Sequence, residues 1–161
     1  MQVHRTTDMD LVRSVITHPS VYPWCCDDAA PSAEEFAPLP ADGDRALYVL
    51  VTDGQACGVF AFYQQNAVTT EAHTCVLPQM WGRTHLAAQA AIAWVFEHTG
   101  FERITTSVPQ DNPLAARLAR RAGMTLYGHN PGSFLRKGVL LGVDLFGISR
   151  KELLCQSQQQ S

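Results

Sequence analysis

The stretch PQMWGRTHLAAQA (residues 78–90) leaves a β-like run at Pro78, turns at Gly82 and enters a long apolar helix. A helix that begins directly after a strand presents unpaired backbone N–H groups and the positive end of its dipole at its first turn. Such a turn favours an anion such as phosphate, and Arg83 and His85 add positive charge to it. Because plain structural turns share this pattern, the surrounding elements must decide what the turn is for.

The residues before this turn are rich in β-branched and aromatic side chains. We expect three strands, Ala46–Thr52, Ala56–Tyr63 and Val68–Leu77. Asp53-Gly54-Gln55 separates the first two and predicts a tight hairpin turn. Three consecutive antiparallel strands therefore lead into the helix.

The N-terminal segment predicts a short strand, Val3–Arg5, and then a helix that Asp8 caps, with apolar residues at helical spacing from Leu11 to Ile16. From Ser20 to Asp44 the chain is rich in Pro, Ala, Asp and Glu. We expect an irregular surface segment there, with at most one short helix near Ser32–Phe36.

The C-terminal half alternates between helix and strand patterns. We predict a helix Arg83–His98, a strand Arg103–Val108, a helix Asn112–Ala122, and strands Met124–Gly128 and Val139–Ser149. This element order predicts an α+β fold in a single domain over residues 1–155. The polar tail, residues 156–161, is expected to be disordered.

Composition excludes several classes of function. The chain has 12 Lys and Arg against 15 Asp and Glu, a net charge of −3, so nucleic acid is not the expected partner. It contains neither a membrane-spanning apolar run nor a signal-peptide pattern, so we expect no membrane partner and a cytoplasmic protein. Its five cysteines form no C-x-x-C pair, which favours reduced thiols and predicts no metal site.

The order of motifs around Gly82 resembles that of the GNAT N-acetyltransferase superfamily. Glu71, Pro78 and Trp81-Gly82-Arg83-Thr84 stand in the order of a strand glutamate, a proline and a Trp-Gly-Lys-Gly turn in the branch similar to ribosomal-protein alanine acetyltransferases. Residues 103–108 and 112–124 resemble that family's next strand and its Asn-initiated helix. The chain also looks like GNAT-like proteins of tailed phages and prophages.

This resemblance implies a mixed, mostly antiparallel sheet whose central strands splay, flanked by helices, with acetyl-coenzyme A (acetyl-CoA) held between Val68–Leu77 and Arg103–Val108. It implies that the pantetheine arm pairs with the backbone near Cys75, Val76 and Leu77. The remaining cofactor-binding residues that it implies are Trp81, Gly82, Arg83, Thr84, His85, Leu86, Ala87 and Asn112.

Acetyl transfer to an amine needs a base for the ammonium proton and an acid for the departing thiolate. The resemblance makes Glu71 the first candidate base, and His73, on the same strand face, is the second because its ordinary pKa suits proton transfer near neutrality. In many relatives a tyrosine on the helix after the Asn loop is the acid, but Ala119 stands there in this chain. Tyr127 is the nearest replacement.

Residues of the irregular segment are the candidates for acceptor recognition, namely Tyr22, Trp24, Asp27 and Asp28. Their acidic side chains would suit a cationic amine such as a protein N-terminus or a small molecule. The alternative is a catalytically silent GNAT-fold module, possibly of phage origin, that binds a protein partner or serves in virion assembly. Leu140–Ser149 could pair across a homodimer.

Overall fold

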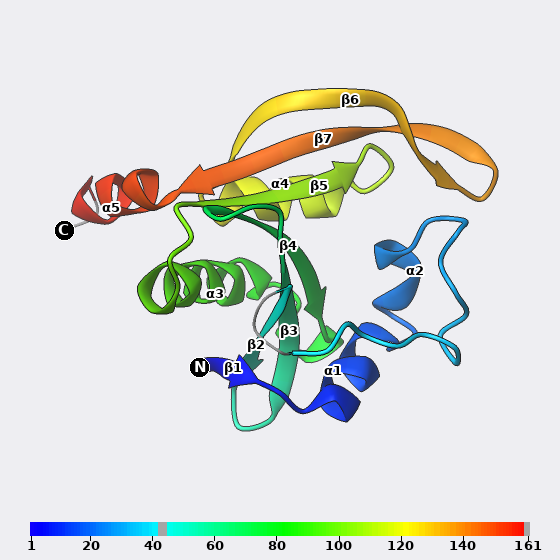
Figure 1. The fold of residues 1–161 in the computed structure, drawn as a ribbon, viewed down its shortest axis with the longest axis horizontal. Helices are drawn as coiled ribbons and strands as arrows, with labels where there is room; N and C mark the ends of the chain where they lie inside the picture. The colour runs from blue at the N-terminus through cyan, green and yellow to red at the C-terminus, as the bar shows by residue number, and fades with distance from the viewer. Residues whose placement is uncertain (42–44, 160–161) are drawn as a thin grey trace.

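The computed structural model describes residues 1–41 and 45–159 (Figure 1). These residues form a seven-stranded sheet with the order β1-β2-β3-β4-β5-β7-β6. The strands are β1 Gln2–Thr6, β2 Ala46–Thr52, β3 Ala56–Gln64, β4 Thr69–Val76, β5 Arg103–Pro109, β6 Thr125–Arg136 and β7 Val139–Ser149. The helices are α1 Met9–Ile16, α2 Tyr22–Cys25, the 3-10 turn η1 Pro78–Met80, α3 Thr84–His98, α4 Pro113–Arg121 and α5 Arg150–Gln159.

The sheet is antiparallel except between β4 and β5, which run parallel at its centre. A parallel pair requires a crossover connection, and α3 supplies it. The β4–β5 register covers only Thr69↔Arg103, Thr70↔Ile104 and Glu71↔Thr105. Beyond these pairs the two strands separate, so the central splay that the resemblance implied is present.

Two hydrophobic clusters cover the two faces of the sheet. On one face, α3 and α4 pack over Phe60, Ile104 and Phe146. On the other face, α1 packs over Tyr48 and Val59. Side chains alternate across a strand, so both clusters draw on residues of the same β2, β3 and β4 strands. The core therefore fixes both helix layers relative to the gap between β4 and β5.

The segment between α1 and β2 differs from the prediction. The short helix lies at Tyr22–Cys25, where Pro23 occupies its first turn, and residues 32–36 form only a turn. This turn has a hydrogen bond from the Phe36 N–H to the Ser32 carbonyl at 3.0 Å but does not continue as a helix. The Arg13 guanidinium donates to the carbonyl oxygens of Glu34 at 2.7 Å and Phe36 at 2.8 Å and so fastens the turn to α1. The helix predicted near Ser32–Phe36 is thus reduced to a single turn.

The C-terminal part also differs from the prediction. β6 continues to Arg136, eight residues past the predicted end at Gly128, because β7 pairs with it despite an irregularity between Asn130 and Phe134. The α5 helix runs to Gln159, so the tail expected to be disordered from Gln156 is helical up to that residue. Gln156 Nε2 donates to the carbonyl of Gly123 at 3.1 Å, which ties the helix to the domain. Residues 160 and 161 lie outside the described residues.

The last strand is not an edge of the sheet. Between Val143 and Gly147, β7 pairs with β5 on one side and with β6 on the other. The prediction that Leu140–Ser149 pairs across a homodimer is therefore wrong for this part of the strand, because its backbone groups already have partners. In the part of the chain that the structure describes, no helix is long and apolar enough to cross a membrane.

Candidate active-site cleft

A cleft of about 1020 Å³ opens where β4 and β5 part. It passes through the sheet: α3 and α4 border it on one face, and α2 with the end of β6 borders it on the other. Its walls include Ala72, Thr74 and Val76 of β4 and Ser107 of β5. A ligand that fills this cleft would pass between β4 and β5 and contact residues on both faces of the sheet.

The backbone of β4 offers unpaired groups to this gap. The Leu77 N–H donates to the Cys57 carbonyl of β3 at 2.8 Å, and N–H groups alternate in direction along a strand. The Ala72 N–H points toward β5 and belongs to the last bridge of the ladder, Glu71↔Thr105. The Ala72 C=O and the N–H and C=O groups of Thr74 and Val76 therefore point toward the side that β5 has left. Among the residues predicted to pair with a pantetheine arm, Val76 has this direction, whereas Leu77 is already bonded to β3.

Cys75 also faces away from the gap between the strands. Its backbone has the same direction as that of Leu77, and its side chain, 2% exposed, packs in the α1 cluster. The predicted role of Cys75 in holding the cofactor arm is therefore corrected: its neighbours Thr74 and Val76 present their backbone groups to the cleft instead.

The N-terminus of α3 forms one end of the cleft. Gly82 has φ 87°, a left-handed conformation that glycine adopts without strain. Arg83 is the N-cap residue and makes no side-chain capping bond, so the first-turn amides at Thr84 and His85 have no capping side chain. The Thr84 hydroxyl donates back to the Met80 carbonyl at 3.3 Å. The first turn of α3 is therefore not occupied by a capping side chain, and its binding of an anion stays a prediction.

The cations at this end are not all those predicted. Arg117 and Arg121 of α4 line the cleft beside His85, and Arg121 Nη2 lies 3.0 Å from His85 Nε2. Arg83 instead forms an ion pair with Asp53 at 3.0 Å and is absent from the cleft wall. Arg117 and Arg121 were not among the residues predicted for the site, although their i, i+4 spacing places them on one face of α4.

The other residues predicted for the cofactor fall into two groups. Trp81 and Asn112 line the cleft, and the Asn112 side chain also caps α4 by accepting the Ala115 N–H at 3.1 Å. Leu86 is 44% exposed and lies outside the cleft wall, whereas Ala87 is buried in the core under α3. Neither Leu86 nor Ala87 offers a side chain to a ligand in the cleft.

His73 is the candidate base that lines the cleft. Its ring stands edge-on to Tyr63, with centroids 5.1 Å apart. Loss of surrounding water lowers the pKa of His73 below its ordinary value of 6.5, while the nearby charge of Glu71 acts in the opposite direction. His73 is therefore largely neutral near pH 7 and able to accept a proton.

Glu71 and Tyr127 lie outside the cleft wall. Glu71 is at the last paired position of β4 and accepts a hydrogen bond from Gln65 at 3.3 Å, two residues from His73 on the same strand face. Tyr127 is 52% exposed on β6, with the Arg103 guanidinium 5.0 Å from its ring centroid. The position of Tyr127 gives no support to its predicted role as an acid.

Of the residues predicted to recognise the acceptor, one lines the cleft and the others bond within their own loop or to the β6–β7 hairpin. Trp24 lines the cleft, but the Tyr22 hydroxyl donates to the Pro31 carbonyl at 2.7 Å, and burial raises the pKa of Tyr22 to about 12. Asp27 accepts the Ala29 N–H at 3.0 Å in a local turn. These bonds shape the loop around α2, so Tyr22 and Asp27 are structural in this arrangement.

Asp28 holds the β6–β7 hairpin in place. Its two carboxylate oxygens accept the N–H groups of Lys137 at 2.6 Å and Gly138 at 2.7 Å. Both hairpin residues have positive φ, so the carboxylate stabilises a tight and strained turn. The hairpin thereby extends from the sheet toward the loop of α2 (Figure 1).

Arg136, which was not among the predicted site residues, holds the same region together from inside. It is 8% exposed and pairs with Asp111 at 2.7 Å. Its guanidinium also donates to the carbonyl oxygens of Trp24 at 3.1 Å and Cys26 at 3.4 Å. A buried arginine that joins β6, α2 and the loop before α4 carries no local sequence signal, because only the tertiary fold brings these partners together.

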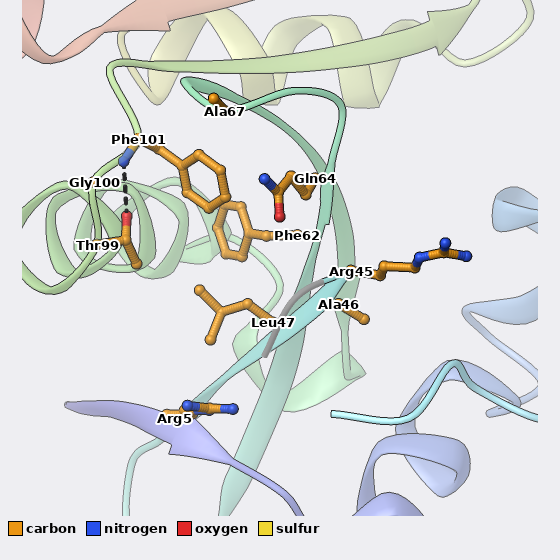
Figure 2. A pocket seen from close by; sticks show the side chains of 10 residues that line it. All are labelled: Arg5, Arg45, Ala46, Leu47, Phe62, Gln64, Ala67, Thr99, Gly100 and Phe101. Atoms are coloured by element: carbon orange, nitrogen blue, oxygen red, sulfur yellow. Dashed lines mark hydrogen bonds between the residues drawn. The ribbon is translucent and has the colours of Figure 1, made fainter. Parts of the chain in front are cut away.

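A second, smaller cavity of about 290 Å³ lies between β1–β3 and the end of α3 (Figure 2). Phe62 and Phe101 form its apolar interior, and Arg5 and Arg45 are among its other lining residues. None of the predicted site residues lines it. The cleft at the β4–β5 gap is therefore the candidate active site.

Comparisons with known proteins agree with this fold. A family model described as "Acetyltransferase (GNAT) domain" matches residues 2–125 of the 161, and the protein belongs to this family. Acetyltransferases of the GNAT family use acetyl-CoA. No curated protein matches the chain.

Among solved structures, a mutant of spermidine N-acetyltransferase from Vibrio cholerae superposes with a TM-score of 0.78 at 16% identity, covering 98% of this chain and 99% of that one. The structure of spermidine N-acetyltransferase from Vibrio cholerae in complex with CoA and spermine gives a TM-score of 0.73 at 16% identity, covering 95% and 98%. At this level of identity the similarity shows the fold.

Proposed function

We propose that this protein is an N-acetyltransferase that moves an acetyl group from acetyl-CoA to a primary amine. One observation carries the proposal: the splay of β4 and β5 joins a cationic helix terminus on one face of the sheet to His73 on the other, through one cleft. A donor and an acceptor that enter from opposite faces would meet at this gap.

The residues present fit acetyl-CoA, which supplies an activated thioester when bound. The first turn of α3 with Arg117 and Arg121 offers amides and positive charge to its phosphates. The backbone of Ala72, Thr74 and Val76 offers hydrogen bonds to the amide groups of its pantetheine arm, in the manner of an added strand.

His73 is the residue that we assign to proton removal. The amine acceptor is protonated in water near neutral pH and must lose a proton before it can attack the thioester. The lowered pKa keeps His73 neutral at pH 7, and Glu71 lies close enough to stabilise its protonated form. In this proposal Glu71 assists His73, and its own action as a base through water is the alternative.

The acceptor end of the cleft favours an amine with an apolar body. Trp24 and Phe134 line this end, and Asp111 is engaged by Arg136 at 2.7 Å. Asp111 is the only carboxylate among the described residues that line the cleft. A polyamine carries several charges that would each need a partner, so we expect it to be a poorer acceptor than an amine with one charge.

The test is an acetyl-transfer assay that follows release of the CoA thiol, with a no-amine background. The acceptors are a peptide N-terminus, as the resemblance to ribosomal-protein alanine acetyltransferases suggests, a phenylalkylamine and spermidine. We expect turnover with the first or second acceptor and at least tenfold lower kcat/KM with spermidine. Turnover of spermidine alone would refute the proposed acceptor chemistry, and no turnover with a wider amine panel would refute the proposed activity.

A second candidate is a protein that binds acetyl-CoA without transferring the acetyl group. Ala119, buried in the cleft wall, stands where relatives have a tyrosine, and Tyr127 lies elsewhere. This candidate predicts acetyl-CoA binding by calorimetry with no thiol release above background for any amine.

A further inference from the structure

Two cysteines from distant parts of the chain meet at the acceptor side of the cleft. Cys25 is the last residue of α2 and Cys75 lies near the end of β4, and their Sγ atoms are 3.8 Å apart. Both are free thiols in the structure. Formation of a disulfide would require only a short approach of the two sulfur atoms.

The two thiols have different surroundings. Cys25 is exposed and lines the cleft, so a small molecule can reach it, whereas Cys75 is 2% exposed beneath it. The hydrogen bond from Cys75 and then the positive charge of Arg136 lower the pKa of Cys25. The same hydrogen bond and burial raise the pKa of Cys75. Cys25 is therefore the more nucleophilic site and Cys75 its protonated neighbour.

We propose that Cys25 and Cys75 form a redox-active dithiol that a low-molecular-weight disulfide oxidises through the cleft. The Cys25 thiolate attacks one sulfur of the reagent, which forms a mixed disulfide and releases one thiolate. Cys75 then loses its proton and attacks Cys25 Sγ, which forms the Cys25–Cys75 disulfide and releases the second thiolate. The two protein thiols lose two electrons in total, and the reagent disulfide gains them.

The other cysteines are poorer partners for Cys25. Cys26 lies beside Tyr22, burial raises its pKa, and a bond between adjacent cysteines closes a strained ring. Cys57 is buried in the opposite hydrophobic cluster. Cys155 is exposed on α5, in the part of the chain that follows β7. The geometry therefore specifies one pair.

The disulfide would connect α2 to β4 beside the candidate base. Trp24, next to Cys25, lines the acceptor side, and His73 is two residues before Cys75 on the same face of β4. Oxidation would hold α2 against the strand and remove the Cys25 thiol from the cleft. We expect oxidised protein to transfer acetyl groups at least fivefold more slowly and dithiothreitol to restore the rate. This consequence for activity rests on the proposed function.

The dithiol itself is tested without activity. The protein is incubated with oxidised glutathione, the remaining thiols are alkylated under denaturing conditions, and peptides are analysed by mass spectrometry. We expect a cross-linked peptide that joins Cys25 to Cys75, with loss of two hydrogens and no retained glutathione. In Cys75→Ala the glutathione should remain on Cys25, and in the control variant Cys26→Ser the cross-link should form as in the unmodified sequence.

Three results would overturn the dithiol: a stable glutathione adduct on Cys25 with Cys75 unmodified in the original protein, a Cys25–Cys26 disulfide, or a Cys25 that does not react while the exposed Cys155 does. The two proposals fail separately. A Cys25–Cys75 cross-link in a protein that acetylates no amine would sustain the dithiol and refute the acetyltransferase.

Discussion

The two ends of the β4–β5 pair differ in how their polar groups are satisfied. At the paired end, residues Thr69–Glu71 of β4 pair with β5. There the side chain of Arg150, which follows β7, bonds to the C-terminal end of α3. At the splayed end, the last residues of β4 do not pair with β5, and the first turn of α3 has no capping side chain among the described residues. The same strand, β4, and the same helix, α3, therefore have one end bonded within the protein and one end open to the cleft.

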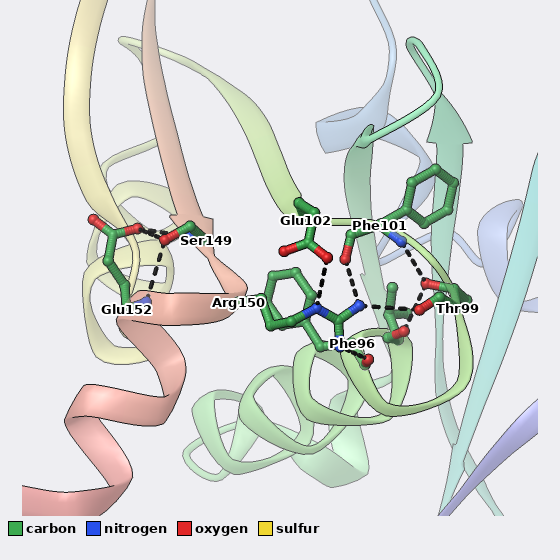
Figure 3. Close-up of polar contacts among 8 residues, drawn as sticks. Phe96, Thr99, Phe101, Glu102, Ser149, Arg150 and Glu152 are labelled. Atoms are coloured by element: carbon green, nitrogen blue, oxygen red, sulfur yellow. Dashed lines mark hydrogen bonds and ion pairs between the residues drawn. The ribbon is translucent and has the colours of Figure 1, made fainter.

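Arg150 makes the paired end rigid (Figure 3). Its guanidinium donates to the carbonyl oxygens of Phe96, Thr99 and Phe101 and pairs with Glu102 at 3.1 Å. Phe96 belongs to the last turn of α3, where carbonyl oxygens have no further helical N–H to accept, and Thr99 and Phe101 belong to the loop after it. Positive charge at this terminus also complements the helix dipole.

The contrast teaches that α3 has a capped end and an open end with different purposes. Its C-terminus is satisfied within the protein and contributes to stability. Its N-terminus has no capping side chain, and in our proposal it binds the phosphates of acetyl-CoA. Substitutions at the paired end should therefore change the free energy of unfolding, and substitutions at the splayed end should change binding or turnover.

The largest expected effect is on turnover. His73→Gln should lower kcat by about 10²- to 10⁴-fold, the usual range for loss of a general base, with little change in the melting temperature. Because the pKa of His73 is lowered, activity should fall only as the pH drops below about 6.5, where His73 becomes protonated. The pH profile of kcat for both proteins checks this.

Glu71→Gln is the matched variant on the same strand face. We expect a smaller loss of kcat than for His73→Gln and a shift of the acid limb to lower pH, because Glu71 raises the pKa of His73. If Glu71→Gln loses activity while His73→Gln turns over at a near-normal rate, Glu71 is the base and His73 only assists it.

The next effect is on stability at the paired end. Arg150→Ala should lower the free energy of unfolding by about 2 to 3 kcal/mol, because it leaves several carbonyls without a donor. Chemical denaturation checks this. The control Glu102→Gln removes only the exposed ion pair and should cost less than about 1 kcal/mol. Equal losses for both variants would contradict the assignment of stability to the carbonyl contacts.

Asp28→Ala should have a moderate effect near the splayed end. It removes the acceptor for the Lys137 and Gly138 N–H groups, and about 1 to 2 kcal/mol of unfolding free energy should be lost. Asp27→Ala, whose carboxylate has only a local turn bond, is the control and should cost less. If Asp28 instead binds the acceptor amine, its variant would raise the KM for the amine without loss of stability.

Tyr127→Phe should have the smallest effect. The ring lies on β6 away from the cleft, so removal of its hydroxyl should change kcat by no more than about twofold. A tenfold loss would correspond to about 1.4 kcal/mol of lost transition-state stabilisation. A loss of kcat at high pH in this variant would restore Tyr127 as the acid.

Most of the fold could be predicted from the sequence because its signals are local. Runs of β-branched and aromatic residues predicted β2 to β5, an apolar run closed by Thr99-Gly100 predicted α3, and Asn112-Pro113 marked the start of α4; the bounds agree to within about two residues. The long β6 was not predictable, since its Asn, Pro and Gly residues disfavour a strand and only the pairing with β7 stabilises it.

The site was less predictable because the directions in which its side chains point are set by tertiary contacts. The order of strand, glycine and helix predicted the turn at Gly82 and the start of α3, for which anion binding remains a proposal. The direction of Arg83 did not, because Asp53 in a distant turn attracts it away from the cleft. Arg117 and Arg121 reach the site only because α4 packs beside α3, and the sequence does not encode that approach locally.

The most direct test of the central claim is a calorimetric titration with acetyl-CoA of the protein, of Arg117→Ala/Arg121→Ala, and of Arg83→Ala as the matched control. We predict micromolar affinity, equivalent to about 8 kcal/mol, for the protein and for Arg83→Ala, and at least tenfold weaker binding for the double variant. No binding by the folded protein, or a loss in Arg83→Ala equal to that in the double variant, would contradict the assignment of the splayed cleft to acetyl-CoA.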